Sequence, residues 1–413
     1  MAVFHAFKAL RPVREKAAAV AALPYDVVNR EEAKAIGDEN PLSFLHVDRP
    51  EMDLEPQIDL YDERVYARAR ENLINMERNG ILVQDEKPCY YIYELVRRGK
   101  IQTGIVGCSS IDDYMNGVVK KHELTREDKE QDRIRHVDSC NANTGPIFLA
   151  CRYPEALLEL MNDWKENHEA AYDFTEEDQI THRVWVIDDA ETVSEISREF
   201  AHIDSLYIAD GHHRAASAVK VGLKRREQNP GYTGEEEFNY FLSVVFPYDQ
   251  LCILPYNRVV RDLNGLTVKA FLGAMKFNFE LMLMPGFPCK PVEKHCMGMY
   301  VDGQWYHLKA WPDIYEKKDV VGQLDVSVLQ EKVLGPILGI EDPRTDQRIS
   351  FVGGNHKAAE LAEIADKTGG VAFVMYPTSM EDLMKIADES KLMPPKSTWF
   401  EPKLRSGLFV HKL

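Results

Sequence analysis

The sequence has no long apolar run, so it lacks a recognisable membrane-spanning helix. Its longer apolar stretches, such as residues 241–246, fall far short of the roughly 18 residues that such a helix needs. Residues 1–20 carry charged side chains from Lys8 onwards and contain no continuous apolar segment of the kind found in secretory signals. We therefore expect a soluble, non-exported cytoplasmic protein with no membrane partner.

An excess of positive charge is also missing. The 413 residues include 50 Lys and Arg against 67 Asp and Glu, which gives a formal net charge of −17. Because binding to a polyanionic backbone depends on cations that neutralise phosphates, we expect no nucleic-acid partner. Any phosphate that the protein binds must be met by local cations.

The seven cysteines include no C-x-x-C pair, so neither a disulfide framework nor a zinc ribbon is indicated. We expect reduced, mostly buried thiols. The nearest approach to a metal cluster is the set Cys289, His295 and Cys296, which has no evident fourth ligand. Packing in a core or a loop is the better interpretation of these three residues.

Several familiar catalytic signatures are absent. The chain has no G-x-x-x-x-G-K-[ST] phosphate loop, no G-x-G-x-x-G dinucleotide turn and no G-x-S-x-G nucleophile elbow. His122 and Glu123 are adjacent, but no second histidine follows at the spacing of an H-E-x-x-H zinc helix. A metalloprotease is therefore disfavoured.

Apolar periodicity predicts the alternating helices and strands of a mixed α/β fold. Helices are expected at residues 30–36, after a cap at Asn29, and at 61–79, 191–200, 326–334 and 380–389. Strands are expected at residues 90–95, 102–108, 184–187, 205–209, 240–246, 299–301 and 371–376. We expect an N-terminal lobe, residues 1–250, interleaved with a C-terminal lobe, residues 251–413, which has a closing tail.

The strongest local signal is Asp210-Gly211-His212-His213-Arg214, which follows a predicted strand and opens an alanine-rich helix. A helix N-terminus presents free backbone N–H groups and partial positive charge, which suit phosphate. Arg214 suits bidentate phosphate binding, the two imidazoles suit donation to phosphate oxygens, and Asp210 suits Mg²⁺ or a histidine. The plain alternative is a histidine pair that caps and packs the helix.

A second signal lies at Lys120-Lys121-His122-Glu123. Glu123 suits a general base, because the neighbouring cations keep its carboxylate ionised and ready to take a proton from a hydroxyl group. The plain alternative is a solvated charge cluster, followed by a helix after residue 125 whose exposed face carries ordinary ion-pairing residues. In this alternative, the exposed residues are Arg126, Glu130 and Arg133.

The third signal is in the tail, where prolines, aromatic residues and cations are mixed. Lys396, Ser397 and Thr398 combine hydroxyl groups with a cation, and further polar residues stand behind them. Such groups suit a carboxylate or a phosphate. The residues behind are Lys403, Arg405 and Ser406. A tail that merely covers a sheet is the alternative.

These three motifs, in this order, resemble those of the free serine kinases built on the ParB/sulfiredoxin fold. The matching segments are VKKHEL at residues 119–124, IADGHHRAA at 208–216 and PPKST at 394–398. The resemblance implies a kinase that phosphorylates free L-serine to O-phosphoserine, with Mg²⁺ and with ATP, ADP or pyrophosphate as donor. It also implies a ParB/sulfiredoxin-like core elaborated by large insertions and by extra N- and C-terminal elements.

The resemblance implies roles for particular residues. Glu123 would deprotonate the seryl hydroxyl with His122 beside it, and Asp210 would hold Mg²⁺. Donor phosphates would be held by Gly211, His212, His213 and Arg214. The amino acid would be faced by Lys396, Ser397 and Thr398. The same cleft would be lined by Tyr25 and Asp26, with His46 and Arg49 as weaker candidates.

Over nearly its whole length the chain also resembles domain of unknown function 1015, through residues 23–28, 40–50 and 394–407. That resemblance implies no activity. The alternative function is a ParB-like nucleotide-binding regulator, although no helix-turn-helix or basic stripe accompanies the motifs. A sulfiredoxin-like reductase ranks last, because it needs a cysteine where Gly211 and His212 stand.

Overall fold

The computed structural model describes residues 1–413, which divide into two compact units. The first unit comprises Met1–Leu251 and Pro402–Leu413, and the second comprises Cys252–Glu401. The end of the chain thus belongs to the first unit. The expected mixed α/β class is confirmed, whereas the ParB/sulfiredoxin-like core stays a prediction.

The first unit is built on a nine-stranded mixed sheet. Its strands follow the order β6-β11-β8-β12-β5-β4-β10-β9, and β1 also pairs with β5. These strands are β1 (Phe4–His5), β4 (Tyr90–Arg97), β5 (Lys100–Ser110), β6 (Val119–Lys120), β8 (Ile147–Cys151), β9 (Tyr172–Thr175), β10 (Ile180–Ile187), β11 (Leu206–Asp210) and β12 (Tyr240–Pro247). Two small pairs complete the unit: β2 (Leu10–Pro12) with β3 (Leu82–Gln84), and β7 (Ala142–Asn143) with β21 (His411–Lys412).

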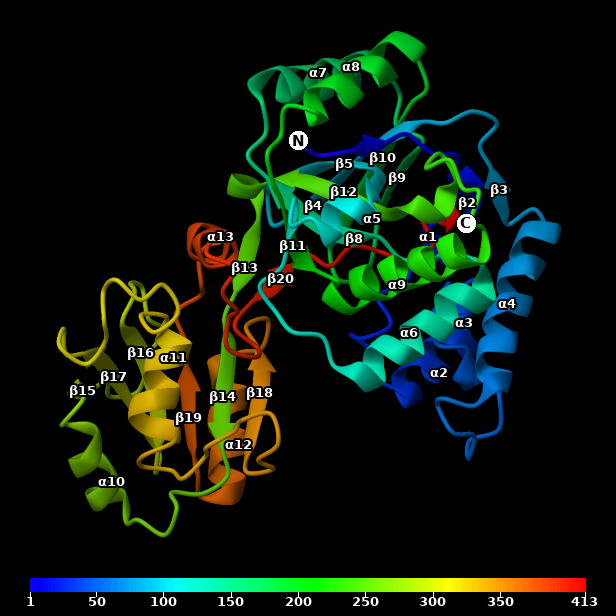
Figure 1. The fold of residues 1–413 in the computed structure, drawn as a ribbon. Helices are drawn as coiled ribbons and strands as arrows, with labels where there is room; N and C mark the ends of the chain where they lie inside the picture. Colours follow the sequence, from blue (N-terminus) through cyan, green and yellow to red (C-terminus); the bar gives the residue numbers. More distant parts are fainter. The chain divides into compact units, whose positions relative to one another are not determined.

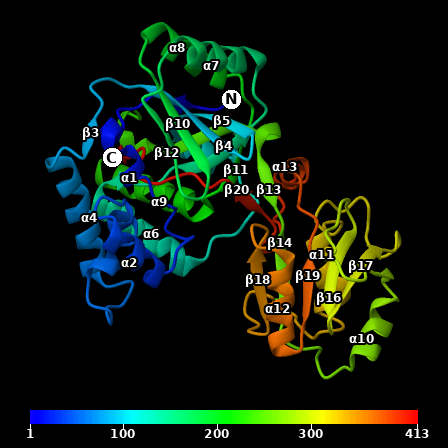
Figure 2. The same ribbon diagram turned by 180° about the vertical axis from the view of Figure 1, so that it is seen from behind.

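Helices lie on both sides of this sheet. In both ribbon views α7 and α8 lie together on one side, and α9 and α6 lie on the other (Figure 1, Figure 2). Apolar side chains such as Leu157 of α7, Ile196 of α8 and Ala215 of α9 belong to one buried core with the strands. The helices are α1 (Ala17–Val20), α2 (Arg30–Glu39), α3 (Leu45–Asp48), α4 (Glu63–Arg78), α5 (Ile111–Met115), α6 (Glu127–Cys140), α7 (Glu155–Asn167), α8 (Ala190–Phe200) and α9 (His212–Gln228).

Several local predictions are confirmed. Asn29 caps α2, and its side chain and that of Glu32 form a capping box. Strands β4 and β5 contain the predicted strand segments 90–95 and 102–108, and they pair as an antiparallel hairpin. The turn between them places Arg98 and Gly99 at positive φ, which fits a tight hairpin connection.

The alternative interpretation, an exposed charged face on α6, is wrong at two of its three positions. Glu130 is only 4% exposed and Arg133 only 8%. Arg133 pairs with Asp132 at 2.8 Å, and Glu130 accepts a hydrogen bond from Thr125 at 2.6 Å. Helix α6 packs against other helices of the unit, so these two side chains are largely removed from water and meet protein partners instead.

The second unit holds a six-stranded antiparallel sheet in the order β15-β17-β16-β19-β14-β18. Helix α12 packs Leu361 and Ala365 against strand residues such as Val259 and Ala372. The strands are β13 (Cys252–Leu254), β14 (Tyr256–Val260), β15 (Phe279–Leu283), β16 (Cys296–Val301), β17 (Gln304–Ala310), β18 (Ile349–Gly353), β19 (Val371–Val374) and β20 (Trp399–Glu401), of which β13 pairs with β20. The helices are α10 (Val268–Met275), α11 (Asp325–Leu329), α12 (Ala358–Thr368) and α13 (Met380–Asp388), and the π-helix Gln330–Leu334 continues α11.

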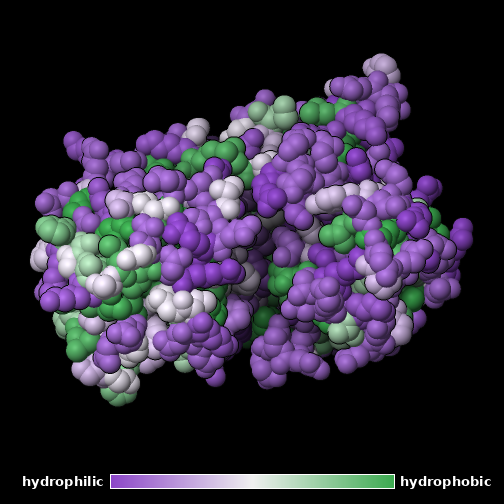
Figure 3. Space-filling view, turned by 90° about the horizontal axis from the view of Figure 1, so that it is seen from below, coloured by the Kyte–Doolittle hydropathy of each residue, from purple (hydrophilic) through white to green (hydrophobic).

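The surface drawn in Figure 3 is mainly hydrophilic and the cysteines are reduced, as the sequence composition indicates. On the face drawn in Figure 3, hydrophilic residues predominate and hydrophobic ones form small, scattered patches. None of the helices is both long and apolar enough to cross a membrane. All seven cysteines are free thiols, and all but Cys252 are buried, as expected.

Candidate functional site

Parallel pairing of two short strands brings the two polar motifs of the first unit together. Strand β6 runs parallel to β11, with Val119 opposite Leu206. Because parallel strands end at the same edge of a sheet, His122 and Glu123 leave that edge beside Asp210 and the start of α9. The carboxyl ends of strands are where open α/β sheets commonly bind ligands.

The junction between β11 and α9 has an unusual backbone. The pairing of β11 with β8 shifts register between Ile208 and Asp210, so the ladder is irregular at the end of this strand. Gly211 then adopts φ 95° and ψ 32°, a left-handed conformation that favours glycine. A Cβ atom on Gly211 would lie 3.0–3.1 Å from the guanidinium of Arg214. With glycine at the N-cap, no capping side chain covers the first-turn N–H groups of α9.

Asp210 is held as an anion between two cations. Its Oδ2 atom lies 3.3 Å from Nζ of Lys403 and 3.5 Å from a terminal nitrogen of Arg214. Burial acts to raise the pKa of Asp210, but the charges of Lys403 and Arg214 prevail and lower it to about 2. The carboxylate is therefore ionised throughout the neutral pH range.

Arg214 is fixed by two contacts and keeps a free donor. One terminal nitrogen donates to the carbonyl of Pro146 at 2.5 Å, and the other meets Asp210. Its Nε atom is buried and has no hydrogen-bond partner. An added Cβ on Gly145 would lie 3.7 Å from this guanidinium, so the backbone passes close by. A ligand oxygen is the kind of acceptor that the Nε–H group lacks.

His122 and His212 form a buried perpendicular pair. Their ring centroids are 4.4 Å apart, with an interplanar angle of 87°. Burial lowers the pKa of each imidazole to about 3, so both rings are neutral at pH 7. No well-formed hydrogen bond from the protein reaches either ring nitrogen of His122 or Nε2 of His212, although the backbone of Ile208 lies near enough to His122 to oppose the effect of burial on its pKa. Unpaired buried polar atoms cost about 1–3 kcal/mol each, which favours a bound ligand here.

Glu123 lies beside this pair and is accessible. Its Oε2 atom is 3.7 Å from Nδ1 of His212, and its side chain is 34% exposed. The ligand atoms of His122, Glu123 and His212 all lie within 4.8 Å of one another, so the three can share a cation. Two imidazoles and a carboxylate suit a transition metal ion, whereas Mg²⁺ prefers oxygen ligands, which Asp210 offers.

His213, Tyr25 and Asp26 lie close to this centre. Nε2 of His213 accepts a hydrogen bond from the backbone N–H of Arg126 at 3.0 Å, which ties the start of α6 to α9. Burial lowers the pKa of His213, and the charge of the exposed Asp26 opposes that effect. Tyr25 is buried, and the guanidinium carbon of Arg133 lies 4.1 Å from its ring centre.

The two weaker candidates are engaged by carboxylates. Nδ1 of His46 lies 2.8 Å from Asp53, and this hydrogen bond raises the pKa of His46. Arg49 forms an ion pair with Glu51 at 2.7 Å and donates to the carbonyl of Tyr25. Arg49 thus holds the backbone of Tyr25 in place, whereas His46 pairs with Asp53 and has no such contact with a candidate residue.

The tail motif belongs to the second unit. The hydroxyl group of Ser397 donates to the carbonyl of Pro394 at 2.6 Å, and Nζ of Lys396 lies 5.3 Å from the ring centre of Tyr256. The substrate-binding roles expected for Lys396, Ser397 and Thr398 stay predictions.

The sequence places Lys403 with the tail motif and does not connect it with Asp210. Lys403 lies in the first unit and is a direct partner of Asp210. Its neighbour Arg405 points elsewhere and pairs with Glu176 and Asp178. The only signal in the sequence was an alternation of cations after Pro402, which does not identify their partners.

The fold and the site define a mixed α/β protein with a candidate anion-binding and proton-transfer centre. The chain belongs to the DUF1015 family, a family described as of unknown function, whose sequence profile matches residues 4–327. No curated protein matches the chain.

Some solved structures are distantly similar. A free serine kinase in complex with AMP is 12% identical, with a TM-score of 0.35, over 77% of this chain and 92% of that one. A conserved hypothetical protein from Pyrococcus furiosus is 13% identical, with a TM-score of 0.36, over 74% and 94%. A C-terminally truncated SbnI from Staphylococcus aureus is 12% identical, with a TM-score of 0.38, over 74% and 86%. At TM-scores below 0.5 these likenesses assign neither an activity nor site residues to this chain.

Proposed function

We propose that this chain is a phosphotransferase that phosphorylates the hydroxyl group of free L-serine. The observation that carries the proposal is a convergence of unpartnered nitrogen donors with one accessible carboxylate at the start of α9. The donors are Nε of Arg214 and one N–H group from each of the neutral rings of His122 and His212, and the carboxylate is that of Glu123. Phosphoryl transfer depends chiefly on alignment and charge neutralisation, which such a set can supply.

The donor in this proposal is ATP, ADP or pyrophosphate, and its phosphates lie at the N-terminus of α9. Arg214 offers a charged N–H group, and neutral His212 offers one further donor. Gly211 removes the side chain that would otherwise crowd the Arg214 guanidinium. The first-turn N–H groups and the positive end of the helix dipole complete the phosphate site.

Asp210 is the residue that fits Mg²⁺ in this arrangement. Its low pKa keeps it ionised, and a carboxylate oxygen is the kind of ligand that Mg²⁺ prefers. When bound, the ion supplies neutralisation of the phosphate charge. Lys403 and Arg214 hold the carboxylate in position.

Glu123 is the general base. It accepts the proton of the serine hydroxyl while the hydroxyl oxygen bonds to phosphorus and the bond from phosphorus to the donor's bridging oxygen breaks. The leaving group is ADP, AMP or phosphate, according to the donor. The 34% exposure of the Glu123 side chain leaves room for the substrate to approach.

The test is ³¹P NMR of the purified full chain with Mg²⁺ and L-serine, run separately with ATP, ADP and pyrophosphate. We expect a phosphomonoester signal matching O-phosphoserine with one donor. Glu123→Gln should lower turnover by about 10²-fold or more, while the donor still raises the melting temperature. Glu127→Gln, an exposed change on the neighbouring helix, is the matched control and should turn over normally.

Two results would contradict this function. Unchanged turnover in Glu123→Gln would remove the base assignment. A donor that raises the melting temperature of the wild-type chain without being consumed would instead favour the ParB-like nucleotide-binding regulator.

A further inference from the structure

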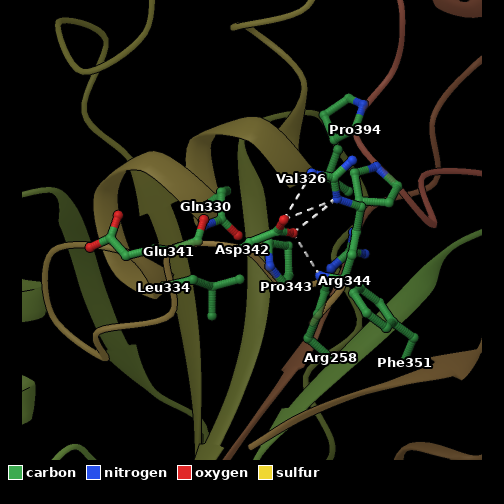
Figure 4. Close-up of a pocket in the computed structure, with 11 residues that line it drawn as sticks. Arg258, Val326, Gln330, Leu334, Glu341, Asp342, Pro343, Arg344, Phe351 and Pro394 are labelled. Carbon is green, nitrogen blue, oxygen red and sulfur yellow. Dashed lines mark hydrogen bonds and ion pairs between the residues drawn. The ribbon is translucent and has the colours of Figure 1, made fainter. Parts of the chain in front are cut away.

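The second unit contains a cavity of about 310 Å³ that the proposed phosphotransfer site does not use. Figure 4 shows Arg258 of β14 and Phe351 of β18 at one side of it, and Pro394 above them. Leu334 and Gln330 of the π-helix lie across the cavity. A π-helix is rare and is often found at functional sites.

Arg258 is a buried guanidinium with no carboxylate partner. The residue is 3% exposed, and its terminal nitrogens donate to the backbone carbonyls of Tyr256 and Lys396. The Phe351 ring centre lies 5.3 Å from its guanidinium carbon. Burial lowers the pKa of Arg258 to about 9, so it still carries its charge at pH 7. A buried charge is normally paired, because desolvation without a counter-ion is costly.

The other charges at the cavity do not neutralise Arg258. The side chain of Arg344 binds Asp342 through three hydrogen bonds of 2.8–3.2 Å, so these two residues neutralise each other. Figure 4 shows the carboxylate of Glu341 pointing away from Arg258. One positive charge is therefore unmatched, and a single negative charge on a ligand would balance it.

The remaining walls are largely apolar. Val326, Leu334 and Phe351 line the cavity together with the rings of Pro394 and Pro395. Apolar walls around one charged group are typical of small-molecule sites, in which the apolar surface supplies affinity and the polar group fixes orientation.

The segment that supplies the proline walls is also the tail motif singled out in the sequence. Lys396 has φ 55°, a left-handed conformation that non-glycine residues adopt rarely, and its carbonyl receives the hydrogen bond from Arg258. The hydroxyl of Ser397 bonds back to the carbonyl of Pro394. These two hydrogen bonds fix residues 394–397 against the Arg258 guanidinium. They keep both the guanidinium and the proline rings at the cavity.

We propose that this cavity binds a small monocarboxylate, whose carboxylate pairs with Arg258 and whose apolar body packs against Phe351 and the prolines. The guanidinium and carboxylate have matching planar, bidentate geometry. This site is separate from the phosphotransfer proposal and does not depend on it.

The test is isothermal titration of the full chain with benzoate, with benzamide as the neutral isostere and phenyl phosphate as the dianion. We expect saturable benzoate binding, no benzamide binding, and weaker phenyl phosphate binding. Arg258→Met should weaken benzoate binding by about tenfold or more, since it removes the charge-assisted pair. Arg261→Met, an exposed change three residues along the same segment, is the matched control and should bind benzoate as the wild type does.

A second measurement, made on the wild-type chain, tests the site even if Arg258→Met fails to fold. In the wild-type chain, the Nε–H resonance of Arg258 should shift on adding benzoate and stay in place with benzamide; Arg258→Lys identifies the resonance by its loss. Equal benzoate affinity in wild type and Arg258→Met would overturn the site. Benzamide binding as tight as benzoate, or phenyl phosphate binding more tightly, would overturn the ligand class.

Discussion

Two buried arginines, one in each unit, differ in what surrounds them. Arg405 of the first unit is 1% exposed and has two carboxylates, those of Glu176 and Asp178. Arg258 of the second unit is 3% exposed and has only backbone carbonyls. An arginine that serves the fold normally brings its counter-ions with it, because an unpaired buried charge is costly. An arginine that lacks them is where a charged ligand is expected.

Among the arginine substitutions, the largest effect should come from removing the matched arginine. Arg405→Met leaves Glu176 and Asp178 without their partner, and we expect a loss of about 2 kcal/mol in the free energy of unfolding. Asp178 is 41% exposed, so solvent screens part of the penalty and keeps the loss below that of a fully buried pair. Urea unfolding followed by circular dichroism measures it.

The comparison breaks if the matched arginine proves dispensable. If Arg405→Met lowered the free energy of unfolding no more than Arg258→Met does, the presence of counter-ions would not distinguish a structural arginine from a ligand-binding one. Arg405→Lys is the matched control, because it keeps the charge while losing the fork geometry, and it should fall between Arg405→Met and the wild type.

The buried imidazoles make a second, pH-dependent prediction. The folded pKa of His122 and of His212 is about 3, below the ordinary value of 6.5, so the unfolded chain binds protons there first as the pH falls. Stability is therefore full above pH 6.5 and falls as the pH drops towards 3, by about 1 kcal/mol per pH unit for each histidine. His122→Gln should reduce this slope, and unfolding at pH 8, where both rings are neutral, gives the reference. If His122→Gln left the dependence of stability on pH unchanged, His122 would not be a buried histidine with a lowered pKa.

Removing the unmatched arginine should cost less. Arg258→Met leaves no carboxylate behind, and it frees only two backbone carbonyls while it ends the burial of a charge. We expect the free energy of unfolding to change by less than about 1 kcal/mol, because the two effects oppose each other. The same urea titration measures it, and a loss above that for Arg405→Met would show that Arg258 is structural.

Local chemistry made much of the fold predictable. The Asn29 cap, the β4–β5 hairpin and the strand that runs into the helix at His212 each depend on residues adjacent in sequence. Glu123 and His212 lie close together because β6 pairs parallel with β11. Neither strand β6 nor this pairing was predicted from the sequence; the resemblance implied only that the two motifs serve one site.

Tertiary partners of charged residues were not predictable from sequence. Glu130 and Arg133 have the spacing of a solvated helix face, but packing of α6 buries them. Lys403 meets Asp210 from the far end of the chain, and Arg258 lies in a strand whose pattern gives no sign of a buried cation. The sequence shows where charged side chains lie along a helix or strand. Their partners depend on which helices and strands pack together, which the pattern does not show.

The smallest effect is expected for an arginine that shares the cavity with Arg258. The side chain of Arg344 is 65% exposed and its charge is already met by Asp342, so Arg344→Gln should leave both the unfolding midpoint and benzoate binding unchanged. Urea unfolding and titration with benzoate on this one variant measure both. If Arg344→Gln weakened benzoate binding as strongly as Arg258→Met, the ligand would be pairing with the exposed arginine, and the lack of buried counter-ions would not identify a ligand-binding cation in this protein.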